Sequence, residues 1–98
     1  MAKYLVQWDM VLPLAPTDLK ERANGYMTLL NMVKQDLESG KTKDWGHFVG
    51  SNSGFSIIEG TEEEISNIIQ KWVPFVRFEA KPFMSVDETT EIVKAWTM

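Results

Sequence analysis

The stretch Trp45-Gly-His-Phe-Val-Gly-Ser-Asn-Ser-Gly-Phe-Ser-Ile-Ile-Glu-Gly60 decides the fold of this chain. Two runs rich in β-branched and aromatic residues flank Asn52-Ser53-Gly54, a pattern typical of a tight β-hairpin. A type I turn over Ser51 to Gly54, with Gly54 at positive φ, would make a three-residue loop with a G1 bulge. The stretch therefore predicts two antiparallel strands joined at this turn.

The only histidine of the chain, His47, lies on the first of these strands, and its neighbours depend on the turn. With the bulge at Gly54, His47 faces Glu59 across the strands. With Asn52-Ser53 as a two-residue loop, His47 faces Ile58 instead. A carboxylate opposite the imidazole could orient the ring as a general base. His47 and Glu59 are therefore candidate catalytic residues, on condition that the first register holds.

Alternating segments on either side of the hairpin predict two further strands. Lys3 to Met10 and Phe75 to Met84 both alternate apolar and polar residues, as half-buried strands do. Pro13 and Pro16 end the first strand, because proline removes a backbone donor and restricts the residue before it. Pro82 places the end of the last strand at a sheet edge or away from its own sheet.

Three helices are predicted between and after the strands. Apolar residues recur at spacings of four and three over residues 19–37, with Thr17 as N-cap and Gly40 just after the C-terminus. Capping boxes at Thr61 and Ser85 open a short second helix and a C-terminal helix.

The first of these helices carries two unusual features. Met27, Leu29 and Met32 lie off its main apolar stripe, so either the core wraps the helix widely or a partner covers them. If the partner is another copy of the chain, this side of the helix would allow an oligomer larger than a dimer. Asn24-Gly25 in the helix interior costs roughly 1 kcal/mol relative to alanine. Close packing, a small kink, or a ligand that approaches the backbone would explain the glycine.

The element order β-α-β-β-α-β, followed by a short helix, predicts a single α+β domain over residues 1–98. Its compact solution is ferredoxin-like, an antiparallel four-stranded sheet with both longer helices on one face. This order and the segments at residues 50–60 and 72–84 (GSNSGFSIIEG and WVPFVRFEAKPFM) resemble the dimeric α+β-barrel superfamily. Within it, the chain is similar to a group of small, functionally uncharacterised prokaryotic proteins.

This resemblance implies a homodimer, because members of the superfamily pair their sheets face to face. Relatives include muconolactone-isomerase-like proteins and cofactor-free monooxygenases similar to those of antibiotic biosynthesis. The fold alone therefore leaves the function open.

Composition excludes several classes of protein. The net charge is −4, with the basic residues scattered, whereas a nucleic-acid binder usually gathers Lys and Arg on one face. No apolar run approaches the roughly 20 residues of a membrane span. The chain has no cysteine and begins without the apolar region of a signal peptide, so we expect a cytoplasmic protein. A single histidine without spaced ligands predicts no metal site, and no cofactor motif is present.

Aromatic residues give the clearest hint of a ligand site. They can either fill the core or line a cleft between sheet and helices, where barrel relatives bind small molecules; the set is Trp8, Tyr26, Trp45, Phe48, Phe55, Trp72, Phe78 and Trp96. Candidate ligand-binding residues are Trp8, Asn24, Tyr26 and Trp45.

Three functions remain open on these residues. The leading hypothesis is a protein of unknown function that binds a small apolar molecule without catalysis. The first alternative is a cofactor-free isomerase or monooxygenase that uses His47 as acid or base, together with Glu59, Asn24 or Tyr26. The second is a purely structural or regulatory oligomer.

Overall fold

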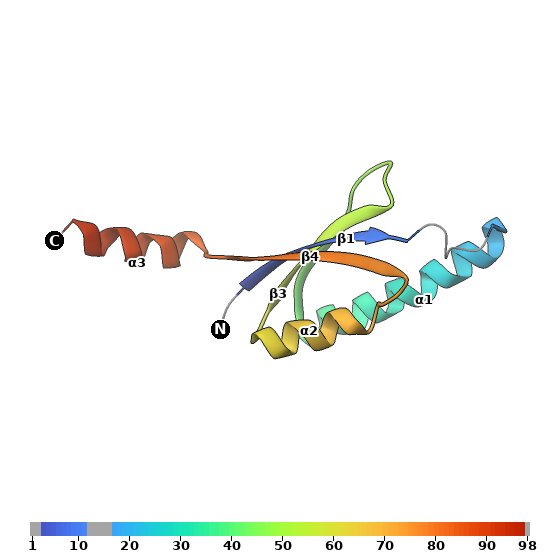
Figure 1. Cartoon of the computed structure of the whole chain (residues 1–98), viewed down its shortest axis with the longest axis horizontal. Coiled ribbons are helices and arrows are strands. Elements are labelled where there is room, and N and C mark those ends of the chain that lie inside the picture. The colour runs from blue at the N-terminus through green and yellow to red at the C-terminus, as the bar shows by residue number, and fades with distance from the viewer. Residues whose placement is uncertain (1–2, 12–16, 98) are drawn as a thin grey trace.

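The computed structural model describes residues 3–11 and 17–97, and its elements follow the predicted order (Figure 1). Pro13 and Pro16, predicted to end the first strand, lie outside these residues. The α+β class is confirmed. None of the described helices is long and apolar enough to cross a membrane. The elements are β1 (Lys3–Met10), α1 (Leu19–Glu38), β2 (Thr42–His47), β3 (Ser53–Glu59), α2 (Glu62–Gln70), β4 (Val76–Phe83) and α3 (Val86–Trp96).

The four strands form one antiparallel sheet in the order β2-β3-β1-β4. Its inner face carries the buried residues Val6, Trp8 and Ile58. Val33 of α1 and Ile65 of α2 pack against these residues, so both helices cover this face, as predicted (Figure 1). Pro82 lies on β4, an edge strand, as expected of a residue that cannot donate to a ladder.

The outer face of the sheet has no helix over it and mixes apolar with charged side chains. Cross-strand pairing puts Leu5 beside Ile57 and Lys81 on this face, and Gln7 beside Phe55 and Glu79. The register places six residues of β1 and β4 on this outer face: Leu5, Gln7, Asp9, Arg77, Glu79 and Lys81.

Helix ends agree with the local signals to within one residue. The N-cap of α1 is Asp18 rather than Thr17, because the Asp18 carboxylate accepts a hydrogen bond from the Glu21 amide at 3.0 Å. Gly40 follows the C-cap with φ +80°, as predicted. The capping boxes at Thr61 and Ser85 are both present. The last strand is one residue shorter at each end than predicted.

The turn of the hairpin differs from both predicted registers. Gly50, with φ +76°, takes the positive-φ position, and the Ser51 amide donates to the Phe48 carbonyl at 3.1 Å. Gly54 does not have positive φ; it lies within β3 and pairs with His47. The chain reverses at Gly50, four residues before Gly54, because glycine at the third position of a four-residue turn readily takes positive φ. The residues between Gly50 and the start of β3 then belong to the loop, which is therefore longer than predicted.

The C-terminal helix α3 stands off the end of the sheet (Figure 1). The radius of gyration is 16.3 Å, against about 13 Å for a compact domain of this length. No residue of α3 is buried, and Val86 and Trp96 are 80% and 75% exposed. An isolated helix of this length is marginal in water, so the apolar side of α3 lacks the cover that would stabilise it.

The first turn of α3 is tied to the sheet by one pH-sensitive contact. Lys3 Nζ lies 2.9 Å from Glu88 Oε1, and the Ser85 amide and hydroxyl also hydrogen-bond Glu88. Hydrogen bonds from Lys3 and then Ser85 hold the pKa of the Glu88 carboxyl at about 2, below its ordinary 4.5. Because the folded-state pKa is lowered, this contribution is complete above about pH 4.5 and is lost as the pH falls through about 2.

We therefore expect the start of α3 to loosen between about pH 4.5 and pH 2. Carboxyl NMR titration of Glu88, followed together with the Ser85 amide, measures both ends of the contact. The Glu88→Gln variant should lack the transition at Ser85. A Glu88 midpoint near 4.5 in the folded protein would contradict the contact.

Candidate functional site

An apolar cleft of about 360 Å³ lies between the inner face of the sheet and the helices α1 and α2. Its walls come from β1, β2, β3, β4 and both helices, and most of the lining atoms are carbon. The lining residues are Trp8, Met10, Tyr26, Leu29, Leu30, Val33, Asp36, Thr42, Trp45, His47, Asn52, Ser56, Ile58, Ile68, Ile69, Trp72, Val76 and Phe78. This size and chemistry suit a small apolar molecule.

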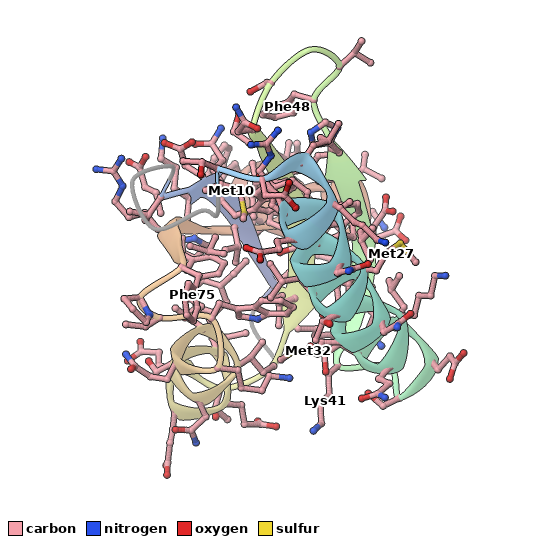
Figure 2. All side chains as sticks on the ribbon, turned by 90° about the vertical axis from the view of Figure 1, so that its right-hand side faces the viewer. Met10, Met27, Met32, Lys41, Phe48 and Phe75 are labelled. Atoms are coloured by element: carbon pink, nitrogen blue, oxygen red, sulfur yellow. The ribbon has the colours of Figure 1, made fainter. Side chains whose placement is uncertain are left out.

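The cleft is partly open toward solvent. The α2 helix has nine residues against twenty in α1, so it faces only part of the longer helix. Figure 2 shows Met32 on the side of α1 that faces α2, Phe75 above α2, and Met10 beside the N-terminal end of α1. Phe75 is 52% exposed, which leaves an aromatic ring in contact with water there.

Two stacked tryptophans and the histidine line the sheet side of the cleft. The Trp8 and Trp45 rings stack with centroids 5.3 Å apart and planes at 10°. His47 stacks on Trp8 at 6.0 Å and 23°. Trp45 and His47 sit two residues apart on β2, so their side chains share a face. Together the three rings make one aromatic surface in the wall of the cleft, and a planar molecule can stack on the ring faces that the other rings leave open.

Gly54 makes this aromatic surface possible. Trp8 is on β1 and Trp45 is on β2, with β3 between them. The Trp8 indole therefore crosses β3 at its pairing partner Gly54, and its Nε1 donates to the Phe55 carbonyl at 3.3 Å. A Cβ on Gly54 would lie 2.4 Å from Trp8 Cζ2 and 2.1 Å from the Gly46 carbonyl oxygen. Only a residue without a side chain fits there.

The His47–Glu59 pair predicted from the bulged turn is wrong in its geometry. His47 pairs with Gly54 and shares the inner face with Trp45, whereas Glu59 pairs with Lys3 and points to the outer face. The alternative partner, Ile58, pairs with Thr42 instead. The longer turn at Gly50 is the cause, because it shifts β2 along β3.

His47 has a different polar partner. Its Nε2 is within hydrogen-bond distance of the Ser51 carbonyl oxygen in the hairpin loop. A carbonyl oxygen only accepts, so Nε2 carries the proton in this contact and the neutral ring has Nδ1 as an acceptor.

Three of the four predicted ligand-binding residues line the cleft. Trp8, Tyr26 and Trp45 do so, and Asn24 does not. Asn24 is exposed on α1, since a residue two positions before Tyr26 points to another side of the helix.

The wider aromatic set divides in the same way. Trp72 and Phe78 line the cleft, whereas Phe48, Phe55 and Trp96 do not. Phe55 alternates with the inner-face residues of β3 and so points outward. Phe48 lies in the hairpin loop and contacts Phe55, with ring centroids 6.2 Å apart. Trp96 is carried away from the body on α3.

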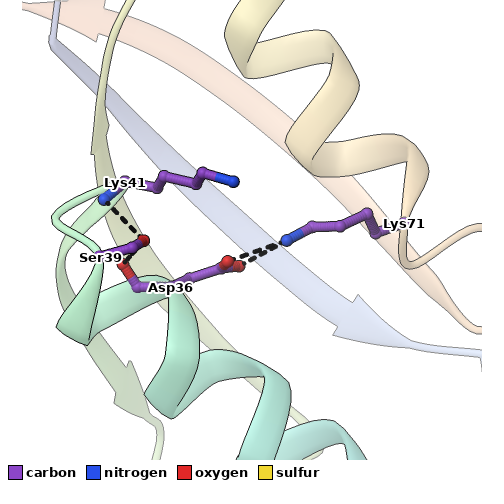
Figure 3. Close-up of polar contacts among 4 residues, drawn as sticks. All are labelled: Asp36, Ser39, Lys41 and Lys71. Carbon is purple, nitrogen blue, oxygen red and sulfur yellow. Dashed lines mark hydrogen bonds and ion pairs between the residues drawn. The ribbon is translucent and has the colours of Figure 1, made fainter.

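An ion pair links the two helices across the cleft (Figure 3). Lys71, the C-cap of α2, places its Nζ 2.9 Å from both carboxylate oxygens of Asp36 on α1. Asp36 is 7% exposed and lines the cleft. The Ser39 hydroxyl donates to the Asp36 carbonyl and holds the end of α1. The pair therefore fixes the distance between the helices at their C-terminal ends.

Asp36 and Ser56, two polar residues of the cleft, were not among the site residues predicted from the sequence. Asp36 interrupts the apolar stripe of α1 three residues after Val33, and Ser56 interrupts the inner face of β3 two residues before Ile58. A polar residue at an apolar position of a periodic pattern is the signal that would have found both. Among the described residues, no three acidic, histidine or cysteine side chains gather as a metal site would require.

Comparison with known families places nearly the whole chain in one family model. A family described as a domain of unknown function, DUF3303, matches residues 2–97. No curated protein matches the chain.

Proposed function

Since the chain belongs to the DUF3303 family, a domain of unknown function, we propose its role from the cleft: it binds a small apolar molecule between sheet and helices. The observation that carries this proposal is the stacked pair of Trp8 and Trp45 in a cleft of about 360 Å³ with an almost wholly apolar lining. Aromatic walls with a few polar groups are typical of ligand sites.

Loss of the stack should weaken binding. Indane, a bicyclic hydrocarbon small enough for the cleft, serves as the probe. We expect Trp45→Ala to weaken indane binding about tenfold, because it removes half of the stacking surface. Phe48→Ala, which removes an exposed aromatic ring outside the cleft, should leave the affinity unchanged. Chemical-shift titration measures both, and equal loss in the two variants would count against the site.

A second candidate function rests on His47. The imidazole lines the cleft, and its contact with the Ser51 carbonyl leaves Nδ1 as an acceptor for a substrate proton. A cofactor-free isomerase or monooxygenase would use His47 as the base with Tyr26, which lines the same cleft, and without Glu59. His47→Gln separates the two candidates, because turnover would then be lost while binding of the molecule persists.

We further propose that the fold is ferredoxin-like and that the protein is a cytoplasmic homodimer of the dimeric α+β-barrel type. The strand order β2-β3-β1-β4, with two helices on one face, supports the fold. Apolar side chains on the uncovered outer face support pairing through it; they are Leu5, Phe55, Ile57 and Phe83. The apolar side of α3 is also uncovered, and a second copy of the chain would cover it. The absence of cysteine suits a reducing compartment.

The dimer can be tested on α3. Val93→Lys puts a charge on the apolar side of the helix, next to Trp96 and Val86 in helical spacing. We expect it to weaken the dimer at least tenfold in sedimentation equilibrium. Glu91→Gln makes the same change in net charge on the polar side and should leave the dimer intact. A monomeric wild-type protein would contradict the dimer.

A further inference from the structure

Two hydroxyl groups on the wall of the cleft have no hydrogen-bond partner among the described residues. Thr42 is 5% exposed and Ser56 is 6% exposed, and both line the cleft. Neither hydroxyl makes a hydrogen bond within the part of the chain that the structure describes. Neither oxygen is fully enclosed, because no fully buried side-chain polar atom of the described residues lacks a partner. Both hydroxyls are therefore open to the space of the cleft, where a molecule bound on its apolar walls meets two free hydrogen-bonding groups.

The strand register places these hydroxyls beside the aromatic surface. Ser56 pairs with Trp45, and Thr42 pairs with Ile58, two residues along β3 from Ser56. Both side chains therefore lie on the inner face within adjacent pairs of the same two strands. A molecule stacked on Trp45 and Trp8 would have one edge next to them.

The charged residues of the cleft limit the chemical class of the ligand group that lies next to the two hydroxyls. Asp36 is the one acidic side chain among the described lining residues, and its carboxylate already has Lys71 as its counterion. An anionic ligand would add a second negative charge to a site of low polarity without a free cation among the described lining residues. Hydroxyl groups both donate and accept, so they match a neutral ketone, amide or alcohol.

Building on the proposed function, we infer that the ligand is a flat apolar molecule with one uncharged hydrogen-bonding group, which the hydroxyls of Thr42 and Ser56 bind. The hydrocarbon part stacks on Trp8 and Trp45. The polar group reaches the two strands at the C-terminal end of α1, where β2 begins.

Three probes of one shape test this assignment: indane, 1-indanone and 1-indanecarboxylate. Chemical-shift titration gives their affinities for the wild-type protein and for the Thr42→Val/Ser56→Ala double variant, which keeps shape and removes both hydroxyls. We expect wild type to bind indanone fivefold to tenfold more tightly than indane, and the carboxylate more weakly than indanone. The double variant should bind indane as wild type does and lose the preference for indanone. Ser56→Ala alone, a smaller change, should lose part of it.

The outcomes separate this inference from the function on which it rests. If indane binds but the preference for indanone is the same in wild type and variants, the ligand class is wrong and the apolar site stands. If none of the three probes binds wild type, the proposed function fails with it. Tight binding of the carboxylate would contradict the inference that the polar group of the ligand is uncharged.

Discussion

Gly54→Ala is expected to destabilise the protein by about 3 kcal/mol, the largest effect of an added methyl group at any of the six glycines. The new Cβ would lie 2.1 Å from the Gly46 carbonyl oxygen, a backbone atom that β2 cannot move without breaking its pairing. It would also lie 2.4 Å from the Trp8 ring. Urea unfolding measures the loss, and the Trp8–Trp45 stack should be lost with it.

Two glycines in the same chain provide matched controls. At Gly25, in the interior of α1, an added Cβ meets no atom within 4 Å. Gly25→Ala should therefore stabilise the protein by about 0.5–1 kcal/mol. At Gly46 the new Cβ would strike the Phe55 ring at 2.3 Å, a side chain that can move. Gly46→Ala should cost less than Gly54→Ala, and Phe55→Leu should relieve it. Equal effects at Gly25 and Gly54 would contradict the packing of Trp8.

Lys71→Met is expected to cost about 2 kcal/mol of unfolding free energy. The substitution leaves the Asp36 carboxylate buried without its counterion. The loss is smaller than for a fully buried pair, because the Lys71 side chain is 37% exposed and water can reach its position. Urea unfolding of Asp36→Leu/Lys71→Met provides the control, since an apolar pair removes the unpaired charge.

The double variant should recover most of the stability that Lys71→Met loses. It should also let the two helices move, because no other ion pair joins α1 to α2 among the described residues. A cost below about 0.5 kcal/mol for Lys71→Met would show that the ion pair is solvated and contributes little.

Local sequence signals predicted the helices and strands well, but they did not predict the turn of the hairpin. The caps at Thr61, Ser85 and Gly40 follow from residues within one helical turn, and all three are as predicted. The hairpin had two glycines that could take positive φ, Gly50 and Gly54. The sequence pattern favoured Gly54 for the turn. In the structure Gly54 lies in β3, where the Trp8 ring from β1 packs against it.

Contacts between distant residues account for the rest of the site. The Trp8–Trp45 stack depends on which residue of β3 lies between the rings, so an error of register hides it. Asp36 and Lys71 are 35 residues apart, and no local pattern joins them. Contacts with distant residues also decide which of the two methionines of α1 is covered. Met32 packs against the core cluster that contains Trp8, while Met27 is 52% exposed, so only Met27 fits the predicted partner surface.

Close packing, one of the explanations predicted for Gly25, is wrong within the described chain, because nothing lies near an added Cβ. The glycine is exposed on α1, one residue before Tyr26, which lines the cleft. An approach of a ligand or of a second copy to the backbone remains a prediction, and the affinity of Gly25→Ala for indane measures the former.

The most direct test of the cleft uses the four tryptophan indole N–H signals of the protein in a two-dimensional nitrogen–proton NMR spectrum. Trp8, Trp45 and Trp72 line the cleft, and Trp96, on the exposed α3, is an internal control. On addition of 1-indanone, we predict that the first three signals move together with one saturation curve while Trp96 stays in place. Movement of Trp96 alone, or of no signal at millimolar probe, would contradict a binding site between sheet and helices.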